Sequence, residues 1–182
     1  MEKQLFEKCD GGYVTDSMLQ EAAVLFSENY GVWGEAAAQV TGKFAKAGKW
    51  YQIGLTFVRK LLAGSRVQLS KERLRAQYLF DNAKCYYVRV IVDGHLAGNV
   101  FACRWTVNGQ NVCWVTQLVV DRNYRERGLA TALLNQLKHD DINIYGIMSS
   151  HPAACLAAAK AFGGKHAEVL DYGSNSKNYR FP

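Results

Sequence analysis

The segment Leu118–Leu134 constrains the fold of this chain more than any other part of the sequence. It begins as an apolar strand that ends at Val120, passes through a short basic turn, and enters a helix near Gly128 and Ala130. Leucines recur every four residues along that helix, so one of its faces is expected to be buried. Small residues at a helix start expose backbone N–H groups at the positive end of the helix dipole. The segment therefore predicts a strand–turn–helix unit that binds an anion, and we expect that anion to be a pyrophosphate.

Capping residues and apolar periodicity predict the other helices. Ser17 and Gln20 have the spacing of a capping box, which places the start of a first helix near Asp16 or Ser17. Ser70 is expected to cap a helix that runs to about Phe80. Further helices are expected over residues 35–47, 51–63 and 152–162.

Strand and turn signals predict a β-meander before the strand–turn–helix unit. Asp93-Gly94 and Asn108-Gly109 are typical two-residue hairpin turns. They separate three expected strands, Cys85–Val92, Leu96–Thr106 and Val112–Val120. Further strands are expected at Leu5–Cys9, Ile142–Met148 and Ala167–Leu170.

Length and composition favour one folded domain over residues 1–182, because 49% of the 182 residues are hydrophobic. No apolar run is long enough for a membrane span, and the N-terminus lacks the pattern of a signal peptide. The five cysteines are scattered without metal-ligand spacing, which favours reduced thiols and argues against zinc. We therefore expect a cytoplasmic protein without a metal, with the nucleus left open.

The formal net charge of +6 needs an explanation, and a polyanionic partner is one that fits. Nucleic acid is one option and a phosphate-bearing cofactor is the other. Arg122, Arg125 and Arg127 form the densest functional cluster of basic residues, and they surround the predicted anion site. This placement favours the cofactor and makes nucleic acid an unlikely partner.

The sequence Leu118-Val119-Val120, followed by Arg125-Glu126-Arg127-Gly128-Leu129-Ala130-Thr131, resembles motif A of the GNAT superfamily of acyl-CoA-dependent N-acetyltransferases. The resemblance implies an α/β fold of the α+β type, with a central mixed, mostly antiparallel sheet flanked by helices. Extra helical material precedes the meander. The resemblance divides the chain into a helical acceptor-side region, residues 13–80, and an acyl-CoA-binding core, residues 83–164.

The resemblance also implies how acetyl-CoA binds. The pantetheine would lie where the central strand diverges from the next one, with its amides paired to the backbone of Leu118 and Val120. A strand bulge near Leu118 and Val119 would direct backbone N–H groups at the thioester carbonyl. The pyrophosphate would be held by the backbone of Arg125, Glu126, Arg127, Gly128, Leu129, Ala130 and Thr131.

Both customary proton-handling residues of the family are replaced in this chain. Gln117 stands where many members have a glutamate base, and Ala159 stands where a tyrosine acid is frequent. A glutamine can orient a water or the substrate but cannot accept a proton at physiological pH. His151 and Glu28 are the candidate substitutes, and we expect His151→Ala to reduce activity more than Gln117→Ala.

Three functions are compatible with these observations. The leading hypothesis is an N-acetyltransferase that transfers an acetyl group from acetyl-CoA to a primary amine, of a small molecule or a protein, by direct attack. The second is a catalytically degenerate module that binds acyl-CoA without transfer, and the third is a basic nucleic-acid-binding protein. The resemblance further implies two final strands, whereas the chain has room for little more than one. The last strand is therefore missing or supplied by a partner, which makes a homodimer through the C-terminal region possible.

Overall fold

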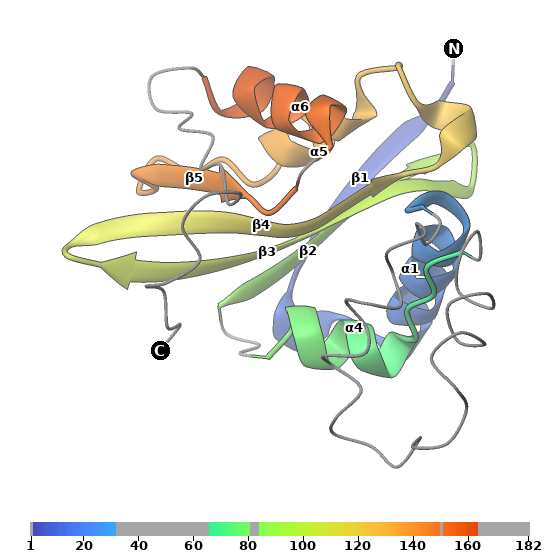
Figure 1. Cartoon of the computed structure of the whole chain (residues 1–182), viewed down its shortest axis with the longest axis horizontal. Coiled ribbons are helices and arrows are strands. Elements are labelled where there is room, and N and C mark those ends of the chain that lie inside the picture. Colours follow the sequence, from blue (N-terminus) through green and yellow to red (C-terminus); the bar gives the residue numbers. More distant parts are fainter. Residues whose placement is uncertain (1, 32–65, 81–83, 150, 164–182) are drawn as a thin grey trace, which may run out of the picture.

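The computed structural model describes residues 2–31, 66–80, 84–149 and 151–163. In these residues a five-stranded sheet lies between two layers of helices (Figure 1). The strands are β1 (Gln4–Asp10), β2 (Cys85–Val92), β3 (His95–Val107), β4 (Gln110–Val120) and β5 (Ile144–Ile147). They are arranged in chain order, and every neighbouring pair is antiparallel except β4 and β5, which are parallel. The predicted mixed, mostly antiparallel sheet is therefore confirmed.

Four α-helices flank the sheet in the described part of the chain. They are α1 (Asp16–Asn29), α4 (Lys71–Tyr78), α5 (Leu129–Asn135) and α6 (Pro152–Phe162). The helices α5 and α6 cover one face of the sheet, and α1 and α4 cover the other (Figure 1). Two 3-10 turns, η1 (Gly11–Tyr13) and η3 (Arg122–Tyr124), join helices to strands. This is an α+β architecture, as the sequence predicted.

Both hairpin turns of the meander form as expected. Asp93 and Gly94 have φ values of 47° and 85°, and Asn108 and Gly109 have 50° and 75°. Positive φ at both central residues matches the right-handed twist of the flanking strands, and asparagine, aspartate and glycine tolerate it best. The two turns fix the register of β2, β3 and β4 and thereby decide which side chains face each helical layer.

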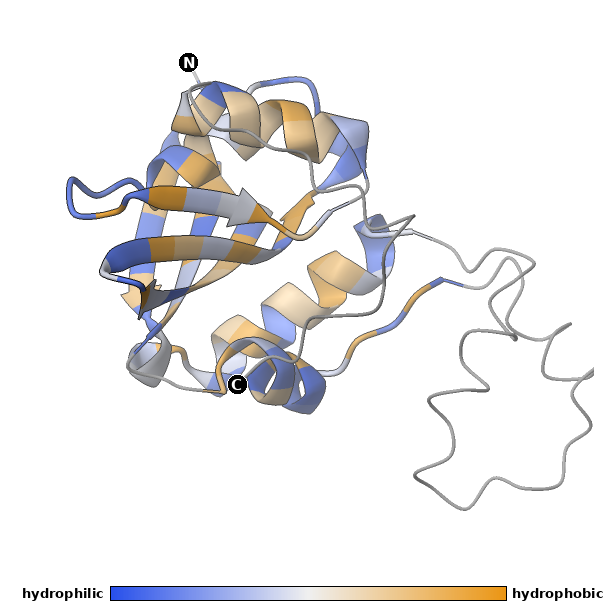
Figure 2. Ribbon diagram, turned by 60° about the vertical axis from the view of Figure 1, so that its left-hand side comes forward, coloured by the Kyte–Doolittle hydropathy of each residue, from blue (hydrophilic) through white to orange (hydrophobic). Residues whose placement is uncertain are grey.

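Alternation along the strands divides the buried residues between the two faces. On the α5 and α6 face, fully buried strand residues such as Val88, Val100 and Val115 pack against leucines of α5. On the α1 and α4 face, Tyr87 and Phe101 pack against apolar residues of both helices. Figure 2 shows hydrophobic residues along the strands, between the two helical layers. Each helical layer therefore has its own core, and the sheet separates the two.

Local details differ from the sequence predictions at two places. Thr15, and not Ser17, caps α1, because its Oγ1 accepts the N–H of Met18 at 3.2 Å. The strand predicted over residues 142–148 is shorter in the structure, since only Ile144–Ile147 pairs with β4. Ser70 caps α4 as expected, and its Oγ accepts the N–H of Arg73.

Three predicted elements lie outside the described residues. They are the helices over 35–47 and 51–63 and the final strand at Ala167–Leu170.

The C-terminal end of α1 is bonded to the loop that follows β4. The buried Asn29 side chain accepts the backbone N–H of Arg122 at 2.9 Å and donates to the Leu25 carbonyl at 3.0 Å. The Asn29 carbonyl in turn accepts a hydrogen bond from the Arg125 guanidinium at 2.6 Å. One residue of α1 thus fixes the loop that leads from β4 into α5.

We expect Asn29→Ala to lower the free energy of unfolding by about 1–3 kcal/mol, because the partly buried backbone N–H of Arg122 loses its acceptor. Chemical denaturation monitored by circular dichroism measures this change. Asn123→Ala is the matched control in the same loop. Its exposed side chain leads us to expect a change within about 0.5 kcal/mol. Equal effects of the two substitutions would contradict the role assigned to Asn29.

Candidate active site

The strands β4 and β5 run together for only part of their length. Val112–Val115 pairs with Ile144–Ile147, and the last shared hydrogen bond joins the N–H of Met148 to the carbonyl of Val115 at 2.9 Å. Beyond that point β4 continues to Val120, and within the described part of the chain its backbone has no strand partner on this edge. An unpaired strand edge offers N–H and C=O groups to an extended ligand.

A β-bulge in β4 lies at the point of divergence. Phe101 pairs with Gln117 and Ala102 pairs with Val115, which leaves Thr116 as the extra residue. Its Oγ1 donates to the Phe101 carbonyl at 3.1 Å. The bulge was expected near Leu118 and Val119, and this prediction is wrong in position. The extra twist of a bulge bends the strand, which suits the place where β4 leaves β5.

Side chains after the bulge alternate between the two faces. Leu118 and Val120 pack against the core of α5 and α6, whereas Val119 packs against Leu25 and Phe26 of α1. Gln117 shares the α1 face with Val119, because it pairs with Phe101, which belongs to the core on that face. The backbone of this segment thus lies between the helical layer of α5 and the helical layer of α1.

The loop after β4 enters α5 through two residues in left-handed conformation. Glu126 has φ 63° and Gly128 has φ 78°, and Gly128 is the N-cap. A Cβ built on Gly128 would meet nothing within 4 Å, so the glycine is favoured there by its backbone conformation. The N–H of Ala132 bonds to the Gly128 carbonyl at 3.0 Å. The N–H groups that precede Ala132 at the start of the helix have no partner inside the helix.

The three arginines of this loop bind the protein itself, which differs from their expected role around a phosphate. The guanidinium groups of Arg122 and Arg125 donate to the carbonyls of Glu28 and Asn29 at the end of α1. Arg127 forms an ion pair with Glu2 at 2.7 Å. In this arrangement each guanidinium already has a protein partner, whereas the first N–H groups of α5 have none inside the helix.

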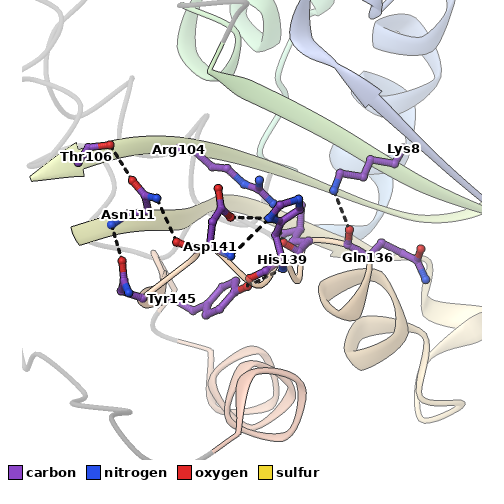
Figure 3. A network of polar contacts seen from close by, with 10 residues as sticks. Lys8, Arg104, Thr106, Asn111, Gln136, His139, Asp141 and Tyr145 are labelled. Carbon is purple, nitrogen blue, oxygen red and sulfur yellow. Dashed lines mark hydrogen bonds and ion pairs between the residues drawn. The ribbon is translucent and has the colours of Figure 1, made fainter. Parts of the chain in front are cut away.

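Two cations hold the opposite end of α5. Lys8 donates to the Gln136 carbonyl at 3.0 Å, and Arg104 donates to the Leu137 carbonyl at 2.9 Å (Figure 3). Both side chains also lie over the Tyr86 ring. Burial and the neighbouring Arg104 lower the pKa of Lys8. Positive charge at a helix C-terminus stabilises the helix dipole, so this end of α5 is fixed to β1 and β3.

The structure does not bring the three predicted catalytic residues together. Gln117 is buried on the α1 face, whereas Glu28 lies on the exposed side of α1, in a groove bordered by Arg66 and Lys71. His151 is the N-cap of α6, on the opposite face of the sheet, and its Nδ1 accepts the N–H of Ala153 at 3.2 Å. Of the three, Gln117 is the one beside the bulge.

Two further polar residues share the buried α1 face with Gln117, and the sequence reasoning missed both. They are Tyr87 of β2 and Asn99 of β3, each 0% exposed. Asn99 could have been noticed, because it is a lone amide between Gly98 and Val100 in an otherwise apolar stretch. Only the register of the sheet shows that it lies near Gln117.

Searches for other kinds of site give two findings. The described residues contain no cluster of three or more histidine, cysteine, aspartate or glutamate side chains arranged to hold a metal ion. None of their helices is long and apolar enough to cross a membrane.

Comparison of solved structures gives relatives of the same fold. One is an aminoglycoside acetyltransferase from an uncultured soil metagenomic sample, with 15% identity and a TM-score of 0.52. The match covers 99% of this chain and 98% of that one. Another is a transcriptional regulator from Bacillus halodurans C-125, with 10% identity, a TM-score of 0.50, and coverage of 98% and 100%. At such identities the likeness concerns the fold alone.

Comparison of sequences identifies the family. A search of curated proteins finds no match. A family model described as Acetyltransferase (GNAT) family matches residues 54–166, which is more than half of the chain. This match agrees with the strand–turn–helix unit, with the mixed sheet and with the divergence of β4 from β5. The chain therefore belongs to the GNAT family of acetyltransferases.

Proposed function

We propose that this chain is an N-acetyltransferase that transfers an acetyl group from acetyl-CoA to a primary amine by direct attack. One observation carries the proposal: the edge of β4 after Val115, which no strand in the described ranges pairs with, leads directly into the loop and the open helix start at Gly128. A strand edge next to a helix start suits a molecule with amides at one end and phosphates at the other. Acetyl-CoA has this chemistry, and the family is one of acetyltransferases.

The cofactor contacts that we propose are made mainly by backbone groups. Leu118, Val119 and Val120 would pair with the pantetheine amides along the free edge of β4. The pyrophosphate would lie against the backbone of Arg125, Glu126, Arg127, Gly128, Leu129, Ala130 and Thr131. The engagement of the arginine side chains by Glu2 and by the end of α1 supports this view, because it leaves the loop backbone in a fixed conformation.

In the proposed reaction the neutral amine nitrogen attacks the thioester carbonyl carbon. A C–N bond forms, the C–S bond breaks, and the proton lost by the nitrogen ends on the released thiol. The chain contributes by positioning both substrates and by directing backbone N–H groups at the carbonyl oxygen. Gln117 would orient the amine, directly or through water, since its amide carries no charge and cannot act as a base.

The domain assignment is also part of the proposal. The acceptor-side region would be residues 13–80, and the acyl-CoA-binding core would be residues 83–164.

A degenerate module that binds acyl-CoA without transfer is the second candidate. Gln117 and Ala159 favour it, because neither side chain can exchange a proton. Release of thiol from acetyl-CoA across a panel of primary amines separates the two candidates. We expect amine-dependent thiol release above the hydrolysis background, and its absence for every amine would favour the module.

We expect acetyl-CoA to bind in isothermal titration calorimetry and Gly128→Ala to weaken that binding at least tenfold. A side chain at φ 78° costs about 1–2 kcal/mol and turns the loop away from its present path. Gly109→Ala is a matched control, because Gly109 has φ 75° and equally open surroundings in the β3–β4 hairpin. It should lose similar stability and keep the wild-type dissociation constant. Binding that both substitutions weaken equally would contradict the proposed pyrophosphate site.

The positions of the two catalytic candidates support a larger role for Gln117 than for His151, contrary to the expectation from the sequence. Gln117 is buried beside the bulge, whereas the Nδ1 atom of His151 already accepts a hydrogen bond as a helix cap. We now expect the near-isosteric Gln117→Met to reduce kcat at least tenfold and more than His151→Ala does. Thiol release at saturating acetyl-CoA measures both variants. A larger loss for His151→Ala would restore His151 as the main candidate.

A further inference from the structure

Three polar side chains occupy one patch on the α1 face of the sheet. Tyr87, Asn99 and Gln117 lie on the neighbouring strands β2, β3 and β4. Asn99 pairs with Arg89 on one side and with Val119 on the other, so both Tyr87 and Gln117 are its diagonal neighbours. The three residues form a continuous row that ends at the bulge in β4. We call this row the polar row.

The polar row is buried and its polar atoms are unpaired. Tyr87 and Asn99 are 0% exposed and Gln117 is 4% exposed. Within the described residues, the Tyr87 hydroxyl and both amide atoms of Asn99 and of Gln117 have no hydrogen-bond partner. Each buried unsatisfied group costs about 1–3 kcal/mol, whereas a whole domain is stable by only about 5–15 kcal/mol. Groups of this kind call for a physical explanation, such as ordered water or a functional role.

The polar row is also uncharged. Arg89, the nearest charged residue in the sheet register, forms ion pairs with Glu7 at 2.6 Å and with Glu21 at 2.8 Å. Burial raises the pKa of Tyr87 well above its usual range, and the nearby Asn99 amide offsets only part of this rise. The Tyr87 hydroxyl and the Asn99 amide are not hydrogen-bonded to each other directly. Tyr87 therefore stays a neutral donor and acceptor at physiological pH.

Apolar groups cover the polar row from the helix side. Leu19, Ala22 and Ala23 of α1 belong to the same core cluster as Tyr87 and Phe101. Leucine and alanine side chains offer no hydrogen-bond partner to the row. Ordered water is the common partner of such groups, and a buried water makes about three hydrogen bonds.

We propose that Asn99 and Tyr87 are positioning residues for acetyl transfer, which hold the Gln117 amide, through ordered water, against a neutral attacking amine. The inference rests on the proposed function. Gln117 is the member of the polar row at the point where β4 leaves β5, so it is the member nearest to the proposed site of transfer. An uncharged row favours the unprotonated amine, which is the form that has a free electron pair for attack. Asn99 and Tyr87 act through Gln117, because they lie behind it on β3 and β2.

The test compares activity and stability in Asn99→Leu and Tyr87→Phe. We expect kcat for acetyl transfer to fall at least tenfold in Asn99→Leu, with KM for acetyl-CoA unchanged. We expect the thermal unfolding midpoint to stay level or rise in both variants, because each removes a buried group that lacks a partner. Tyr87→Phe keeps the ring packed against Phe101. We therefore expect this variant to fold, which keeps the test informative if Asn99→Leu does not fold. A lower unfolding midpoint with unchanged kcat in both variants would overturn the inference.

A double-mutant cycle tests whether Asn99 acts through Gln117. If it does, Asn99→Leu combined with Gln117→Met lowers kcat no further than the worse of the two single substitutions. Additive losses would overturn the positioning role.

Tyr145→Phe is the control for loss of a tyrosine hydroxyl. That hydroxyl is bonded to the backbone N–H and carbonyl of His139, so we expect a lower unfolding midpoint and unchanged kcat. Calorimetry of the wild-type protein with acetyl-CoA keeps the two proposals apart. Binding and turnover in the wild type, together with additive losses in the cycle, would remove only this inference. Absence of both binding and turnover in the wild type would remove the proposed function and this inference with it.

Discussion

The limited pairing of β4 with β5 is the constraint on which the rest of the site depends. The two strands are parallel and share hydrogen bonds only as far as Val115. The bulge at Thr116 follows at once, and the next residues of β4 keep their partners in β3, while among the described residues no strand pairs with their other edge. A longer β5 would occupy that edge with ladder hydrogen bonds. The same strand therefore serves the core with its side chains and remains available to a ligand through its backbone.

The loop between β4 and α5 is fixed mainly by contacts from elsewhere in the chain. Asn29 binds it from the end of α1, Glu2 binds Arg127, and Lys8 and Arg104 hold the far end of α5. These contacts come from α1, from β1 and β3, and from Glu2 just before β1, so one helical layer and the sheet both contribute to the position of one helix start. A site held in this way is organised before a ligand arrives, which reduces the entropy lost on binding.

The polar row illustrates a conflict between stability and function. Five buried polar atoms that have no partner in the part of the chain that the structure describes are costly, whereas apolar residues of the same shape would pack there at little cost. Such costs concentrate at functional sites in proteins, because activity needs groups that the fold alone would not select. The row lies beside the bulge, where we propose that acetyl transfer occurs, and this role would explain why polar groups are kept there.

Local signals allowed much of the fold to be predicted from the sequence alone. The hairpin dipeptides, the Ser70 cap and the Gly128 turn depend on the backbone preferences of a few neighbouring residues, and each formed as expected. Ser17 failed as a cap because Thr15, two residues earlier, has equivalent chemistry and lies at the helix start that formed. The bulge was misplaced because register depends on both partner strands, which no single segment encodes.

The sequence by itself determined the family, the order of the elements and the turn that leads from β4 into α5, because these depend on contiguous residues and on spacing. Only the tertiary structure decided where the arginines of that turn point, since their partners at Glu2, Glu28 and Asn29 are distant in the chain. It also separated His151 from Gln117 by a sheet and brought Tyr87 and Asn99 beside Gln117. The physical reason is that side chains meet across strands through register and pleat, and these relations exist only after the chain has folded.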